Sequence, residues 1–426
     1  MNRRSRQQKA ARRKRRIQRR LAPRRWGRQN KPMMRARNVA YDVSDRTRAT
    51  PVGGIGVMHQ VAQQTGLIDQ IDDQLHLLKI HLPYHESDHV LNIAYNILSG
   101  GDCLEDLELL RNDEAYLDGL GAQRIPDPTT AGDFCRRFTE ADVQALQSLI
   151  NQTRLDVWRQ QDAQTFLEEA VLDVDGTLAP TTGECKQGMD YSYKGVWGYH
   201  PLVVSLANTR EPLFLCNRPG NRPSHEGASD YIDQSIALCR SAGFESILLR
   251  GDTDFSQTAY LDRWDGQKDV WFLFGMDAHR ALVRRAENLD ETAWQPLEHR
   301  PKHEVKTQPR ARPANVKDQV VRDREFKNIR LVSEHVAAFT YSPSKCEKSY
   351  RMVVVRKNLS IERGEQALFD DVRYFFYITN DHTTPAEQLV LTARERSEQE
   401  NLIEQLKNGV KAMRMPVDTL LSNWAY

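Results

Sequence analysis

The first part of this 426-residue chain carries apolar residues at the spacing of amphipathic helices. Between residues 52 and 161 they recur every three or four positions, which places them on one helical face. In the clearest of these helices, Ser87 is the expected N-cap and Gly100-Gly101 supply the stop. The apolar stripe of that helix consists of Val90, Ile93, Ala94, Ile97 and Leu98.

A second helical signal follows at Thr139 and Asp142, whose spacing predicts a capping box. The long helix that it begins would carry Val143, Leu146, Ile150 and Val157. A shorter helix is predicted before it, from Leu104, Leu107 and Leu110. Short helices ahead of a sheet form either a DNA-binding module or a helical cover for the next domain, and no helix-turn-helix pattern decides between them.

The apolar spacing changes near residue 170 to that of β-strands. Runs rich in Val, Leu and Phe predict five strands, at residues 171–174, 199–207, 212–217, 247–249 and 270–275. A helix is predicted at 228–242, with Gly243 as its stop. This order gives three antiparallel strands, then a helix, then a parallel strand.

A β-rich segment interrupts that order after residue 275. Its predicted strands are 329–341, 350–357 and 372–380, preceded by a charged, proline-bearing loop. Helical spacing returns from Pro385, and the last helix is predicted over residues 393–415.

The charge of the chain is divided unevenly. Residues 1–37 hold 17 Lys or Arg and no Asp or Glu, whereas the remainder has 43 basic and 58 acidic residues, a net charge of −15. A basic arm with so little to bury is expected to be disordered and to suit the phosphates of a nucleic acid. The arginines in its middle that are candidates for DNA contact are Arg12, Arg13, Arg15 and Arg16.

Cysteine usage and hydropathy exclude several classes of protein. The six cysteines are scattered, with no close pair and no cluster at zinc-site spacing, which favours a reducing cytosol. No apolar run of about 18 residues is present, and no signal-peptide stretch begins the chain. The sequence therefore predicts a soluble, cytoplasmic protein.

Carboxylates stand at the ends of two predicted strands. Asp173 and Asp175 lie two residues apart, so both leave the same face of the first strand. The fourth strand exits at Asp252 and Asp254. These acids meet only if the two strands are neighbours, as in a ribonuclease H-like sheet. Such a site suits a divalent cation, although Asp and Gly also commonly end strands without binding anything.

The last helix offers a third acid. At 100° per residue, Arg396, Glu400 and Lys407 lie within roughly 40° of one another, beside an apolar arc. Glu398 would lie about 160° from Glu400, and Glu404 would lie about 6 Å farther along the axis. The alternative is an ordinary surface helix with an Arg396–Glu400 pair.

Together these pieces resemble the DDE transposases of bacterial insertion sequences. The resemblance begins near residue 90 and includes the D-x-D-G-T strand at 173–177, the R-G-D-T-D-F strand exit at 250–255 and the Thr379-Asn380 dipeptide. It ends in the last helix, which is similar to the family's Y-x2-R-x3-E-x6-K signature. The resemblance implies an α/β fold with a ribonuclease H-like mixed sheet core.

The expected domains follow from this resemblance and from the composition. They are a disordered basic arm (1–40), a helical, DNA-binding region (41–165), the first part of the catalytic core (166–275), a β-rich insertion (276–384) and the C-terminal helices of the core (385–426).

The resemblance also implies a chemistry. Asp175, Asp252 and Glu400 would be the catalytic, metal-binding acids, and Arg396 and Lys407 would contact DNA. Asp175 is preferred to Asp173 because it lies nearer the strand end. Two Mg²⁺ ions, for which Mn²⁺ can substitute, would support cleavage at the terminal repeats of the element and transfer to target DNA. The implied assembly is a homodimer or larger synaptic complex at the nucleoid.

Two positions depart from the family pattern. Ala393 stands where the signature has tyrosine, and the chain ends at Tyr426, where relatives carry further helical residues. These departures keep a truncated or inactive DNA-binding relic as one alternative. A ribonuclease H-like nuclease without strand transfer is another, and an RNA-binding protein would explain the arm alone.

Overall fold

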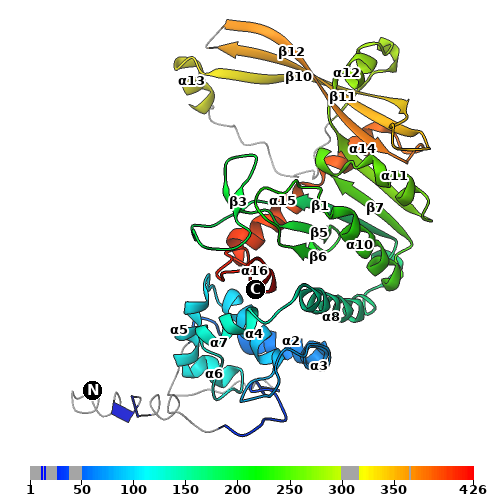
Figure 1. Ribbon diagram of the computed structural model, residues 1–426. Helices are drawn as coiled ribbons and strands as arrows, with labels where there is room; N and C mark the ends of the chain where they lie inside the picture. Colours follow the sequence, from blue (N-terminus) through cyan, green and yellow to red (C-terminus); the bar gives the residue numbers. More distant parts are fainter. Residues whose placement is uncertain (1–10, 13, 16–25, 38–49, 299–315, 364–365) are drawn as a thin grey trace, which may run out of the picture.

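The structure is a computed structural model that describes residues 11–12, 14–15, 26–37, 50–298, 316–363 and 366–426 (Figure 1). Its centre is a nine-stranded mixed sheet with the order β6-β5-β1-β7-β8-β12-β11-β10-β9. The first five strands of this order are β6 (Glu211–Cys216), β5 (Leu202–Leu206), β1 (Glu169–Gly176), β7 (Ser246–Gly251) and β8 (Val270–Met276).

The pairing of β1 confirms the predicted core. β1 is antiparallel to β5 on one side and parallel to β7 on the other. β5 is antiparallel to β6, and β7 is parallel to β8. Three antiparallel strands followed by parallel ones give the ribonuclease H-like arrangement, with the first and fourth predicted strands as neighbours.

Helices cover the sheet because its strands are apolar on both faces. α10 (Ala228–Ala242) buries Ile232, Ile236 and Cys239 in the main core, where α11 (Thr258–Asp265) adds the fully buried Trp264. Another cluster is formed by α14 (Ala386–Arg394) with residues of β8 and β11. Burial of apolar side chains on both faces fixes the strands in register and leaves the polar residues at the strand ends.

The β-rich insertion extends the core sheet instead of forming a separate one. β10 (Lys327–Tyr341), β11 (Tyr350–Arg363) and β12 (Gln366–Thr379) form a long antiparallel ladder. Residues 376–379 of β12 pair with β8, and the short β9 (Gln295–Pro296) closes the other edge. The strands are longer than predicted, and the insertion also contains α12 (Arg280–Glu287) and α13 (Val316–Asp323) (Figure 1).

The N-terminal part of the chain is helical, as expected. Its helices are α2 (Ile55–Gln64), α3 (Leu67–Gln74), α4 (Glu86–Leu98), α5 (Leu107–Asn112), α6 (Glu114–Gly119), α7 (Pro128–Cys135), α8 (Glu140–Trp158) and α9 (Ala163–Phe166), with a 3-10 turn η1 (Leu104–Asp106) before α5. The capping box of Thr139 and Asp142 begins α8 as predicted.

Two details of the helical region differ from expectation. The N-cap of α4 is His85 instead of Ser87, because the helix begins two residues earlier and Ser87 donates to the carboxylate of Asp72. In α8, Ile150 and Val157 are exposed, while the neighbouring Leu149 and Trp158 are buried. Val143 and Leu146 are buried as predicted, so the stripe that faces the core differs from the prediction only in the second half of the helix.

Part of the segment assigned to the arm packs against this region. The backbone N–H groups of Met33 and Met34 donate to the carboxylate of Asp88, and both methionines are buried. Arg12 and Arg15 are exposed in helical stretches, and the other arm residues, Arg13 and Arg16 included, lie mostly outside the described residues. The predicted disorder of those residues therefore stays a prediction.

The predicted long C-terminal helix is wrong. α14 ends at Arg394, α15 (Ser397–Glu404) begins after a break, and a π-helical turn η4 (Gln405–Gly409) follows it. The break arises where Arg396 turns inward to hydrogen-bond the sheet, as described below. The final helix α16 (Leu420–Ala425) returns toward the N-terminal helices (Figure 1). No helix in the described ranges is long and apolar enough to cross a membrane.

Candidate active site

The two strand-end carboxylates lie at the same edge of the sheet. In the parallel pair of β1 and β7, Val174 stands opposite Gly251. Asp175 and Asp252 are the next residues of the two strands, so the register itself brings their side chains to adjacent positions. Asp252 also caps a 3-10 turn, η2 (Thr253–Phe255), by accepting a hydrogen bond from the Asp254 N–H at 2.9 Å.

A glycine on β8 makes room for this strand exit. A side chain at Gly275 would bring its Cβ to within 3.0 Å of the Thr253 nitrogen and 3.2 Å of the Asp252 carbonyl carbon. The missing Cβ lets the turn after β7 lie directly against β8. This close approach holds Asp252 beside the neighbouring strand.

Asp173 has a different environment from Asp175. Its carboxylate is fully buried and accepts two hydrogen bonds from Arg250, from Nε at 2.7 Å and from Nη2 at 2.8 Å. Arg250 also donates to the carbonyl of Thr392 at 2.8 Å. Both oxygens of Asp173 are therefore committed to a buried ion pair, and the side chain links β1, β7 and the end of α14.

Two polar side chains fix the start of α15 against the strands that flank Asp175. Arg396 donates from Nη2 to the carbonyl of Val174 at 3.1 Å. The buried Gln399 donates to the carbonyl of Val203, which is the β5 residue opposite Asp175. Glu400 follows Gln399 directly and borders the same cavity as the two aspartates.

The other glutamates of α15 are engaged elsewhere. Glu398 forms an ion pair with Arg210 at 3.0 Å. Glu404 accepts a hydrogen bond from the amide of Asn408 at 2.7 Å and does not border the cavity. Among the three glutamates of this helix, Glu400 alone shares a cavity with Asp175 and Asp252.

The cavity has a volume of about 490 Å³ and lies between the strand ends and α15. Its lining includes four acidic residues, Asp175, Asp252, Asp277 and Glu400, and two basic residues, Arg394 and Arg396. No Cys or His borders it within the described part of the chain. A donor set made of carboxylate oxygens fits a hard divalent cation such as Mg²⁺.

The electrostatics of the cavity disfavour its negative charges. Burial raises the pKa of Asp175 to about 6, and the charges of Asp252 and Glu400 add to this rise, while Arg396 opposes it. Burial also raises the pKa of Asp252, again against Arg396. The guanidinium of Arg396 lies 3.6 Å from the Asp175 carboxylate and leaves part of this negative charge uncompensated.

Comparison with known proteins decides the family. The sequence matches the family described as Transposase DDE domain group 1 over residues 32–425. The chain belongs to the DDE transposase family. A search of curated proteins found no match.

A solved structure of a piggyBac transposase, in a synaptic complex with hairpin DNA, is similar at a TM-score of 0.39 and 10% identity. The alignment covers 87% of this chain and 72% of the other. A TM-score this low does not establish a shared fold.

The cavity of this DDE transposase contains one acidic residue, Asp277, that the sequence patterns had not singled out. Asp277 follows the end of β8, the parallel neighbour of β7, and its charge contributes to the raised pKa of Asp252. The signal was present in the sequence, since Asp277 stands two residues after the end of the predicted strand 270–275. Parallel strands bring their carboxyl ends to one edge, so Asp277 could have been included.

The position of the missing signature tyrosine lies on the wall of this transposase cavity. Ala393 borders it, and so do Tyr374, Phe375 and Tyr377 of β12. The insertion therefore supplies aromatic residues to the cavity lining, and Tyr377 packs against the same apolar cluster as Ala393. Phe375 remains partly exposed, with the Lys357 ammonium 4.8 Å from its ring centroid.

The two basic residues of the signature occupy different environments. Arg396 faces the cavity and is mostly buried. Lys407 lies in the π-helical turn, where burial lowers the pKa of its ammonium and the charges of Glu404 and Asp175 act in the opposite direction. Because the helix breaks on both sides of α15, the 100° spacing used to align the three residues does not apply here.

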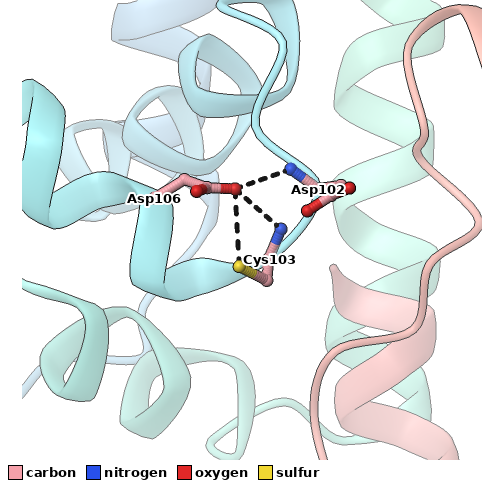
Figure 2. Close-up of side chains that lie close together, drawn as sticks. All are labelled: Asp102, Cys103 and Asp106. Carbon is pink, nitrogen blue, oxygen red and sulfur yellow. Dashed lines mark hydrogen bonds between the residues drawn. The ribbon is translucent and has the colours of Figure 1, made fainter. Parts of the chain in front are cut away.

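A second acidic group lies far from this cavity in the fold. Within the described ranges, Asp102, Cys103 and Asp106 are the one trio of potential metal ligands whose ligand atoms all lie within 4.8 Å of one another (Figure 2). The carboxylate oxygens of Asp175, Asp252 and Glu400 therefore do not all lie within 4.8 Å of one another. The trio belongs to the helical region, at the start of the 3-10 turn η1.

Proposed function

We propose that this transposase binds the ends of a DNA element and catalyses metal-dependent strand cleavage and strand transfer. The convergence of Asp175, Asp252 and Glu400 on one cavity carries this proposal. In the proposed assignment these three acids hold the metal ions, with Mg²⁺ as the natural ion and Mn²⁺ as a substitute. Membership of the DDE transposase family supports the assignment.

Metal ions bound there would activate the attacking hydroxyl and stabilise the leaving oxygen of phosphoryl transfer. The chain's own residues prepare the site for this chemistry. Gln399 and Arg396 hold α15 against β1 and β5, which keeps Glu400 on the cavity side. The raised pKa of Asp175 reflects a carboxylate that gains from a cation, because ionisation is costly without one.

Arg396 and Lys407 are proposed to contact the DNA backbone from two positions. Arg396 borders the cavity, so its contact is proposed at the phosphate that is cleaved. Lys407 is half-buried in the turn after α15 and is proposed to bind a phosphate farther along the strand. The proposed assembly is a homodimer or larger complex, since cleavage and joining involve two element ends.

Matched glutamate variants test the assignment. Wild type, Glu400→Gln and Glu404→Gln are incubated with the terminal-repeat DNA that flanks the gene, in Mg²⁺ and in Mn²⁺, and nicked and joined products are separated by size. Glu400→Gln is expected to lose cleavage in both metals while it keeps DNA binding. Glu404→Gln is expected to retain most activity, because its carboxylate lies outside the cavity.

The products also separate the alternatives. Nicks without joined products would indicate a nuclease without strand transfer. Binding without nicks by the wild type would indicate an inactive relic. If Glu404→Gln lost cleavage and Glu400→Gln kept it, the third acid would be wrongly assigned.

The basic arm is proposed to supply sequence-independent affinity for DNA. The deletion that tests this removes residues 1–25, since Met33 and Met34 are buried against the helical region and must stay. Thirteen of the arm's Lys and Arg residues lie in the deleted part. If about six of them contact phosphates, the log–log salt slope of binding falls in magnitude by about 5. An unchanged slope would show that the arm is not in contact with DNA.

A further inference from the structure

A small hairpin follows the strand that carries Asp175. It is formed by β3 (Asp190–Tyr191) and β4 (Trp197–Tyr199), and β4 also pairs with β2 (Ala179–Pro180). Its tip is a tight turn, in which the Gly195 N–H donates to the carbonyl of Ser192 at 2.9 Å. Gly195 has a φ of +71°, a conformation that favours glycine. Tyr193 and Lys194 occupy the two central positions of this turn.

The tip presents aromatic rings to solvent. The exposed fraction is 77% for Tyr193 and 63% for Tyr191. The Lys194 ammonium lies 5.2 Å from the centroid of the Tyr193 ring, and the Tyr191 ring packs against Trp197 at 4.9 Å. Single exposed apolar residues are ordinary, but Tyr193 on the hydrogen-bonded turn and Tyr191 on the strand before it form a contact surface that is already ordered.

The hairpin is attached to the strand that carries Asp175. β2 begins three residues after the end of β1, and a Cβ on Gly176 would meet the His200 Nε2 at 2.9 Å. His200 directly follows β4, so the base of the hairpin packs next to Asp175. At the tip, the charge of Lys194 acts on the Lys407 ammonium, and so does the charge of Asp175. Lys407 lies in the turn that follows α15, so the tip is within electrostatic range of the end of that helix.

The chemistry of this surface favours a nucleic acid over a protein partner. The chain after residue 37 has a net charge of −15, yet two lysines, Lys194 and Lys407, lie within electrostatic range of each other here. Ring faces combined with ammonium groups are the features that bind a single strand, with bases on the rings and phosphates on the cations. An unpaired base at a DNA end exposes the face that a duplex hides.

We propose that the β3–β4 hairpin binds an unpaired terminal base of the DNA end, with Tyr193 stacked on the base and Lys194 and Lys407 on adjacent phosphates. This inference rests on the proposed function, since it places the DNA end at the same cavity. It adds a recognition surface that the three acids do not provide. Because every base has a ring face, Tyr193 can stack on any of them, so this contact depends little on the sequence of the DNA end.

The test measures stacking without cleavage. The probe is a fluorescein-labelled duplex with a three-nucleotide single-stranded end that carries 2-aminopurine, and a blunt duplex of the same sequence is the comparison. Ca²⁺ replaces Mg²⁺ to prevent cleavage. The full-length variants are Tyr193→Ala, Tyr193→Phe and Lys194→Ala, with Leu109→Ala as a control because Leu109 is 74% exposed in the distant helical region.

The wild type is expected to quench 2-aminopurine and to bind the single-stranded end more tightly than the blunt one. Tyr193→Ala should lose the quenching and bind that end roughly ten-fold more weakly, while its affinity for the blunt duplex stays unchanged. Tyr193→Phe should behave as wild type because the ring remains. Lys194→Ala should keep the quenching and lower the magnitude of the salt slope by about 1.

Three results would overturn the inference. In the first, the Tyr193→Ala variant quenches 2-aminopurine fluorescence as strongly as the wild type does. In the second, the wild type does not quench it at all. The third is a change in the sedimentation of the DNA-free protein on Tyr193→Ala, which would make the hairpin a contact between protein chains. The proposed function fails separately, if the wild type quenches the probe but never cleaves terminal-repeat DNA in Mg²⁺.

Discussion

The two acidic groups of this transposase differ in how their charge is balanced. In the helical region, one carboxylate oxygen of Asp106 accepts hydrogen bonds from the N–H groups of Asp102 and Cys103 and from the Cys103 thiol (Figure 2). The Asp102 backbone N–H is the main cause of a lowered pKa at Asp106. In the cavity, by contrast, the pKa of Asp175 is raised to about 6.

This difference leads us to expect a metal ion at the cavity and none at the tighter trio. The trio around Asp106 is the tighter of the two, yet its shared oxygen already has three donors and Asp102 lies 3.3 Å from the Lys411 ammonium. A carboxylate satisfied in this way gains little from a cation. The cavity acids are farther apart, but their charge has only partial compensation, so a cation would lower their free energy.

The strongest test of this comparison is Asp175→Asn. Removing one charged ligand from the cavity is expected to lower the rate of metal-dependent cleavage by at least about a thousand-fold, which corresponds to about 4 kcal/mol of transition-state stabilisation. Cleavage is measured with saturating DNA, so that weaker binding does not contribute. A variant that retained a tenth of the wild-type rate would remove Asp175 from the metal site.

Asp173→Asn separates folding from catalysis on the same strand. The change leaves Arg250 buried without its carboxylate partner, so the free energy of unfolding is expected to fall by about 3–5 kcal/mol. Below its melting temperature, the variant should keep a measurable rate of cleavage, because Asp173 does not border the cavity. Urea denaturation and cleavage at low temperature check the two parts. Complete loss of cleavage by a folded variant would exchange the roles of Asp173 and Asp175.

The pH dependence of stability tests the uncompensated charge directly. Folding raises the pKa of the Asp175 carboxyl from 3.8 to about 6, so this group loses its proton at a lower pH in the unfolded state than in the folded state. Ionisation of Asp175 therefore favours unfolding, and its penalty appears as the pH rises from about 4 to about 6. Without metal, Asp175→Asn should be about 2 kcal/mol more stable than the wild type at pH 7.5 and equal to it near pH 4.

Denaturant unfolding in EDTA measures this difference at both pH values. Mg²⁺ should then stabilise the wild type and not the variant, because binding to the folded state alone shifts the equilibrium. An equal stability of the two proteins at pH 7.5 would mean that Arg396 compensates the charge in full.

The sequence predicted the strand-end acids because they depend on local patterns. Apolar runs located β1 and β7, and a ribonuclease H-like order required them to be neighbours, so Asp175 and Asp252 followed. The C-terminal part was harder, because the helix breaks between α14 and α15, where the Arg396 guanidinium hydrogen-bonds the Val174 carbonyl. That hydrogen bond is a tertiary interaction, which helical periodicity does not reveal.

The insertion shows the same limit. Its strands were recognisable from their Val, Phe and Tyr content, but the pairing of β12 with β8 depends on contacts between distant segments. This pairing brings Tyr374 and Phe375 to the cavity. Asp277 was missed for the opposite reason, since its position at a parallel strand end was readable from the sequence.

The smallest effect is expected at the acidic group of the helical region, where the Asp106 carboxylate is already hydrogen-bonded. Asp106→Asn removes a charge that caps the turn η1, where its carboxylate accepts three hydrogen bonds. An Asn oxygen can still accept some of them, so the loss of stability is expected to be about 1 kcal/mol. The rate of cleavage and its dependence on Mg²⁺ should stay at wild-type values. Isothermal titration with Mn²⁺ should likewise detect the same number of sites in this variant as in the wild type. A lost site or a shifted metal requirement would show that the tight trio binds a cation, and the rule that satisfied carboxylates bind no metal would fail in this protein.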